Sequence, residues 1–185
     1  MSISLSKGEG INFSKEAPGM KSARIALGWD VNPAFDLDIS IFMLGSNGKI
    51  PNEKYFVFYN NLESQDGSVK FLEDSKTGES SEDYATIEID LTKVNSSIQE
   101  IVLVVTVYDV DGINPTFSQV NNSFMRIYDT ATKQEIAKYE LDDDSSEGTA
   151  MEFCKLSKKE GDWIFHAVGQ GSKLEIESFV DKYAS

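Results

Sequence analysis

Carboxylate side chains recur along the chain, and one pair is spaced for shared chemistry. Asp36 and Asp38 are two residues apart. In an extended chain, alternate side chains point to the same face, with their Cα atoms about 6.8 Å apart. Asp30 follows an apolar run that ends at Trp29, so the intervening loop leads back to the same place. Oxygen donors of this type bind Ca²⁺, which takes roughly six to eight of them.

More oxygen donors follow downstream. Asn60 and Asn61 come after an aromatic run, Asp66-Gly67-Ser68 reads as a turn, and residues 74–83 contain Asp74, Gly78, Glu79, Glu82 and Asp83. Two carboxylates about 5 Å apart repel by roughly 3 kcal/mol at an effective dielectric near 20, and a bound cation removes that repulsion. Asp, Asn, Gly and Ser also form turns on acidic surfaces, so spacing alone leaves both interpretations open. No twelve-residue EF-hand loop is present.

The composition narrows the chemistry further. With 17 basic and 31 acidic residues the net charge is -14, which disfavours binding to phosphate backbones. The chain has one cysteine, Cys154, and one histidine, His166, so a thiolate or imidazole metal cluster is excluded and any metal is held by oxygen. His166 is also the only imidazole base for a nucleophile, and no Gly-x-Ser-x-Gly elbow occurs. We therefore expect no enzyme activity.

The elements that must position these residues are strands. Short runs rich in Val, Ile, Phe and Tyr alternate with turn residues. Nine strands are expected, at residues 23–29, 37–44, 55–59, 85–91, 101–108, 124–128, 135–141, 150–156 and 163–168. The run 101–105 does not alternate, which predicts burial on both faces. Helical spacing is confined to a possible turn at 92–99 and a C-terminal segment with Ile176, Phe179, Val180 and Tyr183.

This pattern predicts an all-β protein: a β-sandwich of two sheets with short peripheral helices, including one near the C-terminus. The length of 185 residues fits a single domain over residues 1–185. The start of the chain lacks the features of a signal peptide, and no run approaches the roughly 20 apolar residues of a membrane span. We therefore expect a soluble, cytoplasmic protein.

The order of several motifs resembles a known family. The motifs are Gly28-Trp29-Asp30, Asp36-Leu37-Asp38, Phe58-Tyr59-Asn60-Asn61-Leu62, Asp66-Gly67-Ser68-Val69, Asp74 with Thr77-Gly78-Glu79, Phe117-Ser118-Gln119-Val120-Asn121-Asn122, and Val168-Gly169-Gln170-Gly171. Together they resemble the TerD family of tellurium-resistance and general stress proteins, from the amino terminus to about Phe179.

The resemblance implies a β-sandwich that binds Ca²⁺, with two ions held by acidic loops at one end. Carried over by position, the first-rank ligands are Asp36, Asp38, Asn60, Asp66, Asp74 and Asp83. The second-rank ligands are Asp30, Asn61, Ser68, Gly78 and Glu79. After Glu79 the family usually continues with glycines and three acidic residues, whereas this chain reads Ser80-Ser81-Glu82-Asp83. One site has therefore lost a ligand or takes one from Glu82.

The function that the resemblance implies is non-catalytic: a calcium-binding stress-response protein associated with tellurite, chemical-stress and phage resistance. It would present a surface to a protein partner, other tellurite-resistance proteins and a membrane-bound one among the candidates. Two alternatives stay open. A cyclic-nucleotide or other small-molecule binder needs cationic groups, and Arg24 and Arg126 are the only arginines. A module that associates with membranes through Ca²⁺ needs apolar or basic loop tips, for which Ile50-Pro51 near Lys49 and Lys54 is the candidate.

Overall fold

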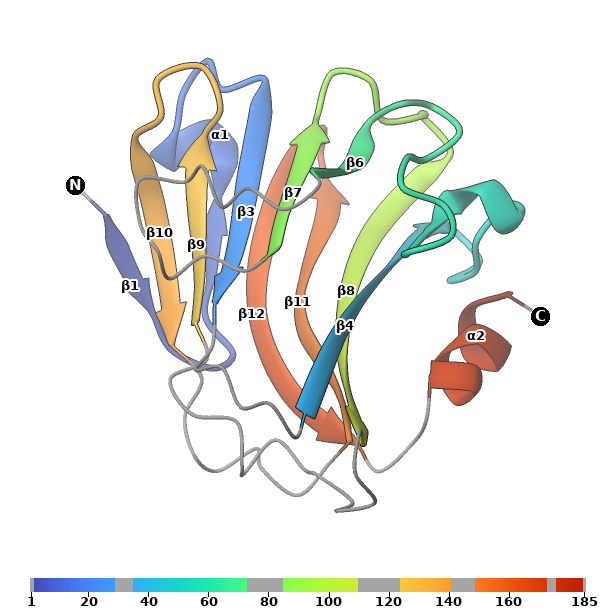
Figure 1. Ribbon diagram of the computed structural model, residues 1–185. Helices are drawn as coiled ribbons and strands as arrows, with labels where there is room; N and C mark the ends of the chain where they lie inside the picture. The colour runs from blue at the N-terminus through green and yellow to red at the C-terminus, as the bar shows by residue number, and fades with distance from the viewer. Residues whose placement is uncertain are drawn as a thin grey trace.

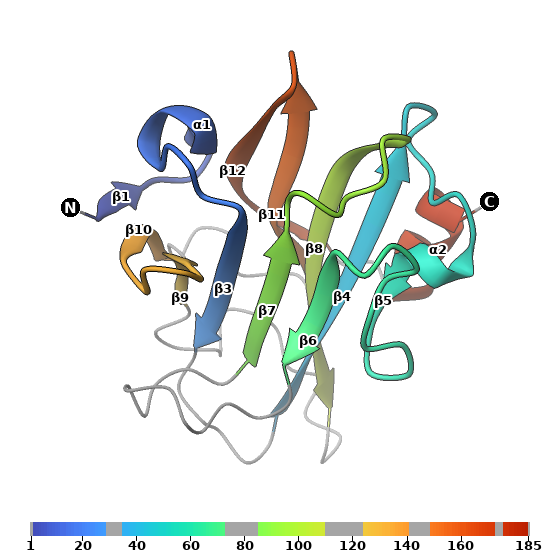
Figure 2. The same cartoon turned by 90° about the horizontal axis from the view of Figure 1, so that it is seen from above.

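The computed structural model describes residues 2–28, 35–72, 85–109, 124–140, 149–172 and 176–184. In these residues twelve strands form two six-stranded sheets, shown in Figures 1 and 2. In order across sheet A lie β1 (Ile3–Leu5), β10 (Glu135–Glu140), β9 (Phe124–Asp129), β3 (Ser22–Gly28), β7 (Ala85–Asp90) and β6 (Val69–Leu72). In order across sheet B lie β2 (Gly10–Asn12), β12 (Asp162–Ser172), β11 (Ala150–Lys159), β8 (Ile98–Asp109), β4 (Phe35–Gly45) and β5 (Phe56–Val57).

Three short helical segments accompany the sheets: α1 (Phe13–Glu16), the 3₁₀ turn η1 (Glu53–Tyr55) and α2 (Ile176–Ala184). The helical spacing near the C-terminus is confirmed by α2. The two sheets pack face to face through one apolar core that draws on both, for example Ile25 and Ile127 from sheet A with Leu103 and Phe165 from sheet B. The expected all-β sandwich with small peripheral helices is therefore confirmed.

The central strand of sheet B is buried on both faces, as its continuous apolar run predicts. Leu103 and Val105 face the core between the sheets, whereas Val102 and Val104 point outward and are nevertheless at most 2% exposed. They are covered because α2 lies on the outer face of sheet B, where Phe179 and its neighbours complete a second, smaller apolar cluster. Figure 1 shows α2 beside β4.

The aromatic run at 55–59 forms less strand than expected. Only Phe56 and Val57 pair with β4, because the chain reverses in a two-residue turn closed by Phe58 and Asn61. The Phe58 amide donates to the Asn61 carbonyl at 3.0 Å, and the Asn61 amide donates to the Phe58 carbonyl at 2.9 Å. Strands β1, β2 and β6 have three or four residues each, too few for alternation to stand out in the sequence.

The pairing registers bring one set of strand ends together. In sheet A, Gly28 at the end of β3 pairs with Phe124 at the start of β9, which also pairs with Glu140 at the end of β10. In sheet B, Phe35 at the start of β4 pairs with Asp109 at the end of β8. Figure 1 shows these ends of both sheets at the bottom of the molecule. This end is called the open end below.

Within the described ranges, no helix is long and apolar enough to cross a bilayer.

Candidate metal centre at the open end of the sandwich

Most of the net negative charge of the chain belongs to connections that start and finish at the open end. Residues 29–34 join β3 to β4, 73–84 join β6 to β7, 110–123 join β8 to β9, and 141–148 lead from β10 toward β11. These four segments hold eleven acidic residues and one lysine, which gives -10 of the total -14. The described residues hold 19 acidic and 15 basic side chains, a net of -4.

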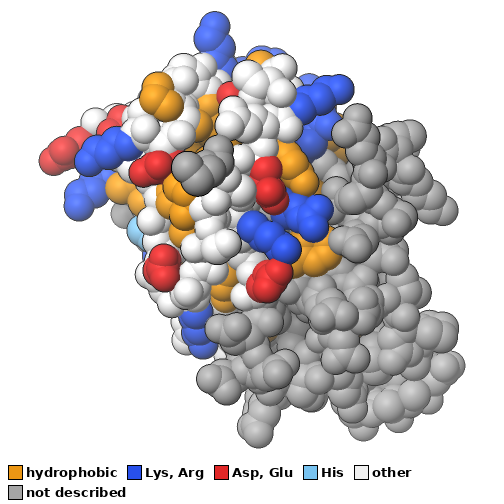
Figure 3. All heavy atoms as spheres, turned by 90° about the vertical axis from the view of Figure 1, so that its left-hand side faces the viewer, with side chains coloured by type: hydrophobic (Ala, Val, Ile, Leu, Met, Phe, Trp, Pro, Cys, Tyr) orange, Lys and Arg blue, Asp and Glu red, His pale blue; other side chains and the backbone are white. Residues whose placement is uncertain are grey.

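The surface of the described strands has no comparable excess of one sign. On the face in Figure 3, Lys and Arg side chains are interspersed with Asp and Glu. Four ion pairs illustrate this mixing on sheet A, between Arg24 and Glu88, Arg126 and Glu135, Lys138 and Glu140, and Lys70 and Glu63. The uncompensated charge therefore belongs to the connections rather than to the sheets.

The two carboxylate positions of the Asp36-Leu37-Asp38 motif lie at the open end. Residue 36 is the second residue of β4 and pairs with Tyr108, while Asp38 pairs with Thr106. Asp38 is half-buried, and its Oδ1 accepts a hydrogen bond from the Ile39 amide at 3.1 Å. The Thr106 hydroxyl donates to the Asp38 carbonyl at 3.4 Å. The rigid pairing of β4 with β8 thus fixes the backbone of both positions.

Asn60 and Asn61 lie in the turn that follows β5. Because β5 runs antiparallel to β4, with Val57 beside Ile41, the chain after Val57 travels toward the half of β4 that carries Asp38. Asn60 is exposed at the tip of the turn. Asn61 is half-buried and its side-chain amide donates to the Phe56 carbonyl at 2.8 Å. Asn61 therefore holds the turn in shape.

Asp66 and Ser68 lie at the other end of sheet A. They precede β6, whose first residue Val69 pairs with Ile89 near the end of β7. The Asp90 amide donates to the Ser68 carbonyl at 2.7 Å. The structure therefore does not bring these two residues together with Asp36 and Asp38.

Both oxygens of the Asp66 carboxylate accept hydrogen bonds from the protein itself. Its Oδ1 accepts from the hydroxyls of Ser64 and Ser68, both at 2.7 Å, and from the Ser68 amide at 3.0 Å. Its Oδ2 accepts from the Asn95 amide at 2.9 Å, which ties two loops together. Partial burial opposes ionisation, but these hydrogen bonds outweigh it and hold the Asp66 pKa below its ordinary value. The hydrogen bond from Asn95 spans 29 residues of sequence, so no local sequence pattern predicts it.

The remaining candidate ligands lie outside the described residues. These are Asp30, Asp74, Gly78, Glu79 and Asp83, together with Glu82 as a possible replacement. In the described part of the chain, no three acidic, histidine or cysteine side chains gather into a metal-binding group.

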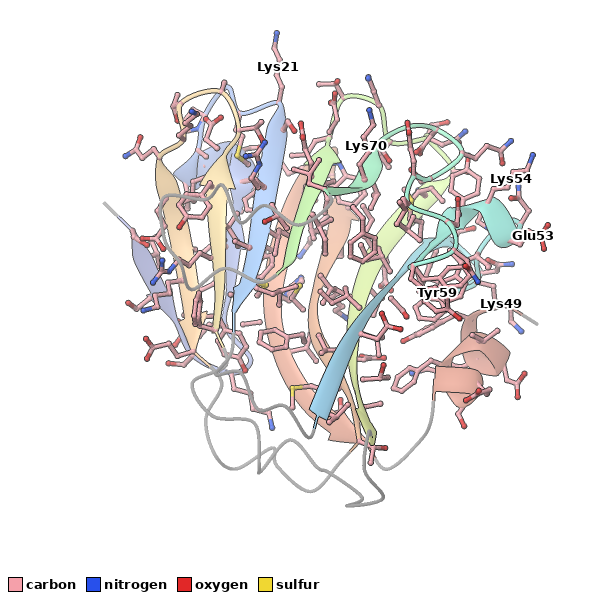
Figure 4. All side chains as sticks on the ribbon, in the orientation of Figure 1. Lys21, Lys49, Glu53, Lys54, Tyr59 and Lys70 are labelled. Carbon is pink, nitrogen blue, oxygen red and sulfur yellow. The ribbon has the colours of Figure 1, made fainter. Side chains whose placement is uncertain are left out.

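The residues proposed for membrane contact are far from Asp36 along β4. Lys49, Ile50 and Lys54 follow the end of β4, whereas Asp36 lies near its start. Ile50 is tied down rather than presented as a tip: its amide donates to the Tyr183 carbonyl at 2.8 Å, and its side chain packs against both apolar clusters. Lys54 projects from the molecule in Figure 4.

His166 and Cys154 serve the strands in which they lie. Cys154 is fully buried in the core, and burial raises its thiol pKa, so the thiol is unreactive. His166 Nε2 is 3.0 Å from the Ser157 hydroxyl across the β11–β12 pair. Partial burial and the nearby Lys155 lower the His166 pKa, which keeps the ring neutral near pH 7.

Comparison with known proteins agrees with this architecture. The TerD domain family matches residues 1–183. The chain is 44% identical to tellurium resistance protein TerD of Serratia marcescens over 99% of this chain and 97% of that protein. It is 37% identical to general stress protein 16U of Bacillus subtilis (strain 168), covering 92% and 91% of the two chains.

Solved structures share the fold at lower identity. A homologue of telluride resistance protein (TerD) from Streptomyces coelicolor A3(2) superposes with a TM-score of 0.68 at 21% identity, over 90% of this chain and all of that one. A second crystal structure, of a protein of unknown function, gives 0.69 at 24% identity, over 90% and 99% of the two chains. On the family match and the close relatives, this chain belongs to the TerD family of tellurium-resistance and general stress proteins.

Proposed function

We propose that this protein is a non-catalytic, cytoplasmic calcium-binding module of a stress response. In it, acidic loops at the open end bind Ca²⁺, two ions in all, and present a surface to a protein partner. Asp36, Asp38 and Asn60 supply ligands from the strands and the adjoining turn. Asp30, Asp74, Asp83 and Glu79, the Gly78 carbonyl and Asn61 complete the ligand sets.

The observation that carries this proposal is the register. The strand pairing brings several strand ends to one end of the molecule, and the four connections that begin and end there have a net charge of -10. Carboxylates that gather at one place repel one another unless a cation lies between them. Hard oxygen donors in excess, with a lone histidine and a buried cysteine elsewhere, favour Ca²⁺ over softer metals. The buried, unpaired Cys154 also fits a reducing compartment such as the cytoplasm.

The test is calorimetric titration of the chelator-treated protein with Ca²⁺. The Asp36→Asn variant removes one charge from the open end and should weaken Ca²⁺ binding at least tenfold while leaving the sheets intact. Mg²⁺ should bind far more weakly, because it loses its hydration waters reluctantly and a site made of many protein oxygens requires that loss.

The matched control is Asp66→Asn, which removes the same charge at the opposite end. It should leave Ca²⁺ affinity unchanged, because the Asp66 carboxylate is occupied by hydrogen bonds from Ser64, Ser68 and Asn95. Equal loss of affinity in both variants would show that bulk charge and not a site governs binding. No Ca²⁺ heat from the unaltered protein at millimolar concentration would reject the proposal.

The names of the relatives indicate a general role in stress and tellurium resistance, and no molecular mechanism. Tellurium resistance and general stress response are the roles in the names of the proteins to which this chain is similar. We propose that the link to tellurite is indirect, because an acidic open end repels an oxyanion. Other tellurite-resistance proteins, a membrane-bound one included, are the partners to test.

A further inference from the structure

The turn after β4 contains Asn47-Gly48, the one Asn-Gly pair in the sequence. The Gly45 amide donates to the Lys49 carbonyl at 2.8 Å and the Gly48 amide donates to the Gly45 carbonyl at 3.0 Å, so the backbone reverses tightly here. Residues 46–48 are exposed. Solvent therefore reaches both the side-chain amide of Asn47 and the main-chain amide that follows it.

The asparagine side chain in this turn folds back onto the backbone that follows it. Asn47 Oδ1 accepts a hydrogen bond from the Lys49 amide at 3.1 Å, which is the Asx-turn arrangement. Three other described asparagines, Asn12, Asn52 and Asn95, accept from the amide two residues on in the same way, at 2.8, 2.9 and 2.9 Å. These four asparagines share one local geometry, so any difference in their reactivity comes from other features.

The residue after the asparagine is the first difference. Gly48 has a φ of +76°, and a Cβ added there would meet nothing within 4 Å beyond its chain neighbours, so the space beside its nitrogen is open. Phe13, Glu53 and Ser96 follow the other three asparagines, and each places a side chain next to the amide nitrogen. Glycine also adopts the widest range of backbone angles, so residue 48 moves toward the asparagine side chain with the least strain.

The environment of the side-chain amide is the second difference. In the other three asparagines a neighbouring side chain hydrogen-bonds to this amide: Gln65 to Asn52 at 2.9 Å, Asp162 to Asn12 at 3.2 Å, and Tyr55 to Asn95. Within the described residues, the Asn47 side chain is bonded only through its oxygen, to the Lys49 amide. The nitrogen of the Asn47 side chain is therefore free to leave.

We propose that Asn47 is a site of spontaneous deamidation in the folded protein. Hydroxide removes the Gly48 amide proton, and the nitrogen attacks Asn47 Cγ to close a succinimide ring. The Cγ–Nδ2 bond breaks, and Nδ2 takes a proton from water and leaves as ammonia, which regenerates the hydroxide. Water then opens the ring at either carbonyl and gives aspartate or isoaspartate. The Lys49 amide stabilises the negative charge that Oδ1 acquires during the attack.

The reaction needs only a local movement of the turn. The Gly48 amide must release the Gly45 carbonyl before it attacks, and the exposure of residues 46–48 makes this opening independent of global unfolding. Isoaspartate adds one main-chain carbon between Gly45 and Lys49, whose hydrogen bond closes the turn. The site is separate from the proposed calcium centre, because none of its residues belongs to the candidate ligand set.

The test is incubation of the full-length protein in mildly alkaline buffer, followed by peptide mapping with mass spectrometry. Asn47 should convert roughly tenfold or more faster than Asn52 and Asn95, because only Asn47 precedes a glycine. The rate should rise with pH, since hydroxide removes the proton. An isoaspartyl methyltransferase with labelled S-adenosylmethionine should place its label on the peptide that contains residue 47.

Two variants keep the comparison specific. Asn47→Ser retains a side-chain oxygen for the Lys49 amide but has no amide to lose, so the labelled peptide should disappear. Gly48→Ala keeps the asparagine and adds a methyl group beside the attacking nitrogen, so conversion should slow roughly tenfold. Thermal melting of both variants checks that the sandwich stays folded.

The unaltered protein decides the matter by itself if a variant does not fold. A sample unfolded in guanidinium chloride gives the reference rate for Asn47 without the turn. An Asn47 that stays intact in the folded protein while the unfolded sample converts would overturn the proposal, as would equal rates at Asn47, Asn52 and Asn95. Conversion in folded Gly48→Ala at the unaltered rate would also overturn it, because the attack would then not depend on the glycine.

Discussion

At the scale of single residues, identical side chains serve different purposes because their surroundings differ. Asp38 and Asp66 are both half-buried aspartates next to turn or strand-end residues. The Asp66 carboxylate accepts four hydrogen bonds from its own chain, so its role is structural. Asp38 lies on β4 near the open end, where four acidic connections begin and end. The sequence alone offers both as calcium ligands, since a local motif does not report which hydrogen-bond donors arrive from distant segments.

Removing the Asp66 carboxylate should cost stability. Asp66→Ala leaves the Ser64 and Ser68 hydroxyls and the Asn95 amide without their acceptor, and we expect a loss of about 1–3 kcal/mol in the free energy of unfolding. Urea unfolding measures this. The control is Glu53→Ala, on an exposed acidic side chain, which should change stability by less than about 0.5 kcal/mol. An equally small effect of Asp66→Ala would mean that the network is not formed in solution.

His166 should make stability depend on pH between 7.5 and 5.5. Its pKa is lowered in the folded state by burial first and then by Lys155. The unfolded chain therefore binds a proton more readily than the folded one, so stability is complete above about pH 7.5 and falls as the pH drops through about 6.5, the ordinary pKa of His. His166→Gln should flatten urea-unfolding stability over this range. A variant that keeps the full slope would assign it to other groups.

At the scale of elements, the short strand β2 depends on a close approach of its backbone to that of β12. β2 pairs with β12 through only three residues, and Gly10 lies opposite His166. A Cβ at Gly10 would lie 2.8 Å from the Phe165 carbonyl oxygen and 3.1 Å from His166 Nδ1. The first distance is to backbone, which cannot move aside without shifting the strand.

Gly10→Ala should therefore loosen β2 from the edge of sheet B. We expect a loss of about 1–3 kcal/mol, in line with overpacking elsewhere, and faster exchange of the amides in β2. Calorimetric melting and hydrogen exchange test this together. Glu9→Ala, on the exposed neighbour, is the control and should melt with the unaltered protein. Unchanged melting of Gly10→Ala would show that β2 accommodates the extra methyl group.

At the scale of the whole molecule, charge and topology act together. The sheets are nearly neutral, while the connections at the open end carry most of the net charge. These connections begin and end at neighbouring strand ends, so we expect their like charges to repel one another and bound cations to relieve that repulsion. The stability of the protein should therefore respond to divalent ions more strongly than to salt.

Thermal unfolding in chelator and in Ca²⁺ tests this. Ca²⁺ at 100 times its dissociation constant stabilises a one-site protein by about 2.7 kcal/mol, which corresponds to roughly 5–10 °C in a domain of this size. NaCl at the same ionic strength should give a much smaller shift, since it screens the loops without bridging them. Equal shifts from both salts would leave screening as the only effect of Ca²⁺.

The sequence by itself determined where the longer strands form and where their apolar residues lie. Short apolar runs bounded by turn residues mark the strands, and helical spacing marks the C-terminal helix, so β3, β7, β8, β9 and α2 match their expected ranges closely. The family motifs also run the length of the chain, which made the family recognisable before any geometry. Such properties are local, because they depend on side chains a few residues apart.

The tertiary structure decided which separated residues meet. Register brings the ends of β3, β4, β8 and β10 to one end of the molecule and leaves Asp66 at the other. It also buries Val102 and Val104 beneath a helix that lies over 70 residues away in sequence. These outcomes depend on loop closure and sheet order, which no short stretch of sequence encodes, because the free energy that selects them comes from contacts between distant segments.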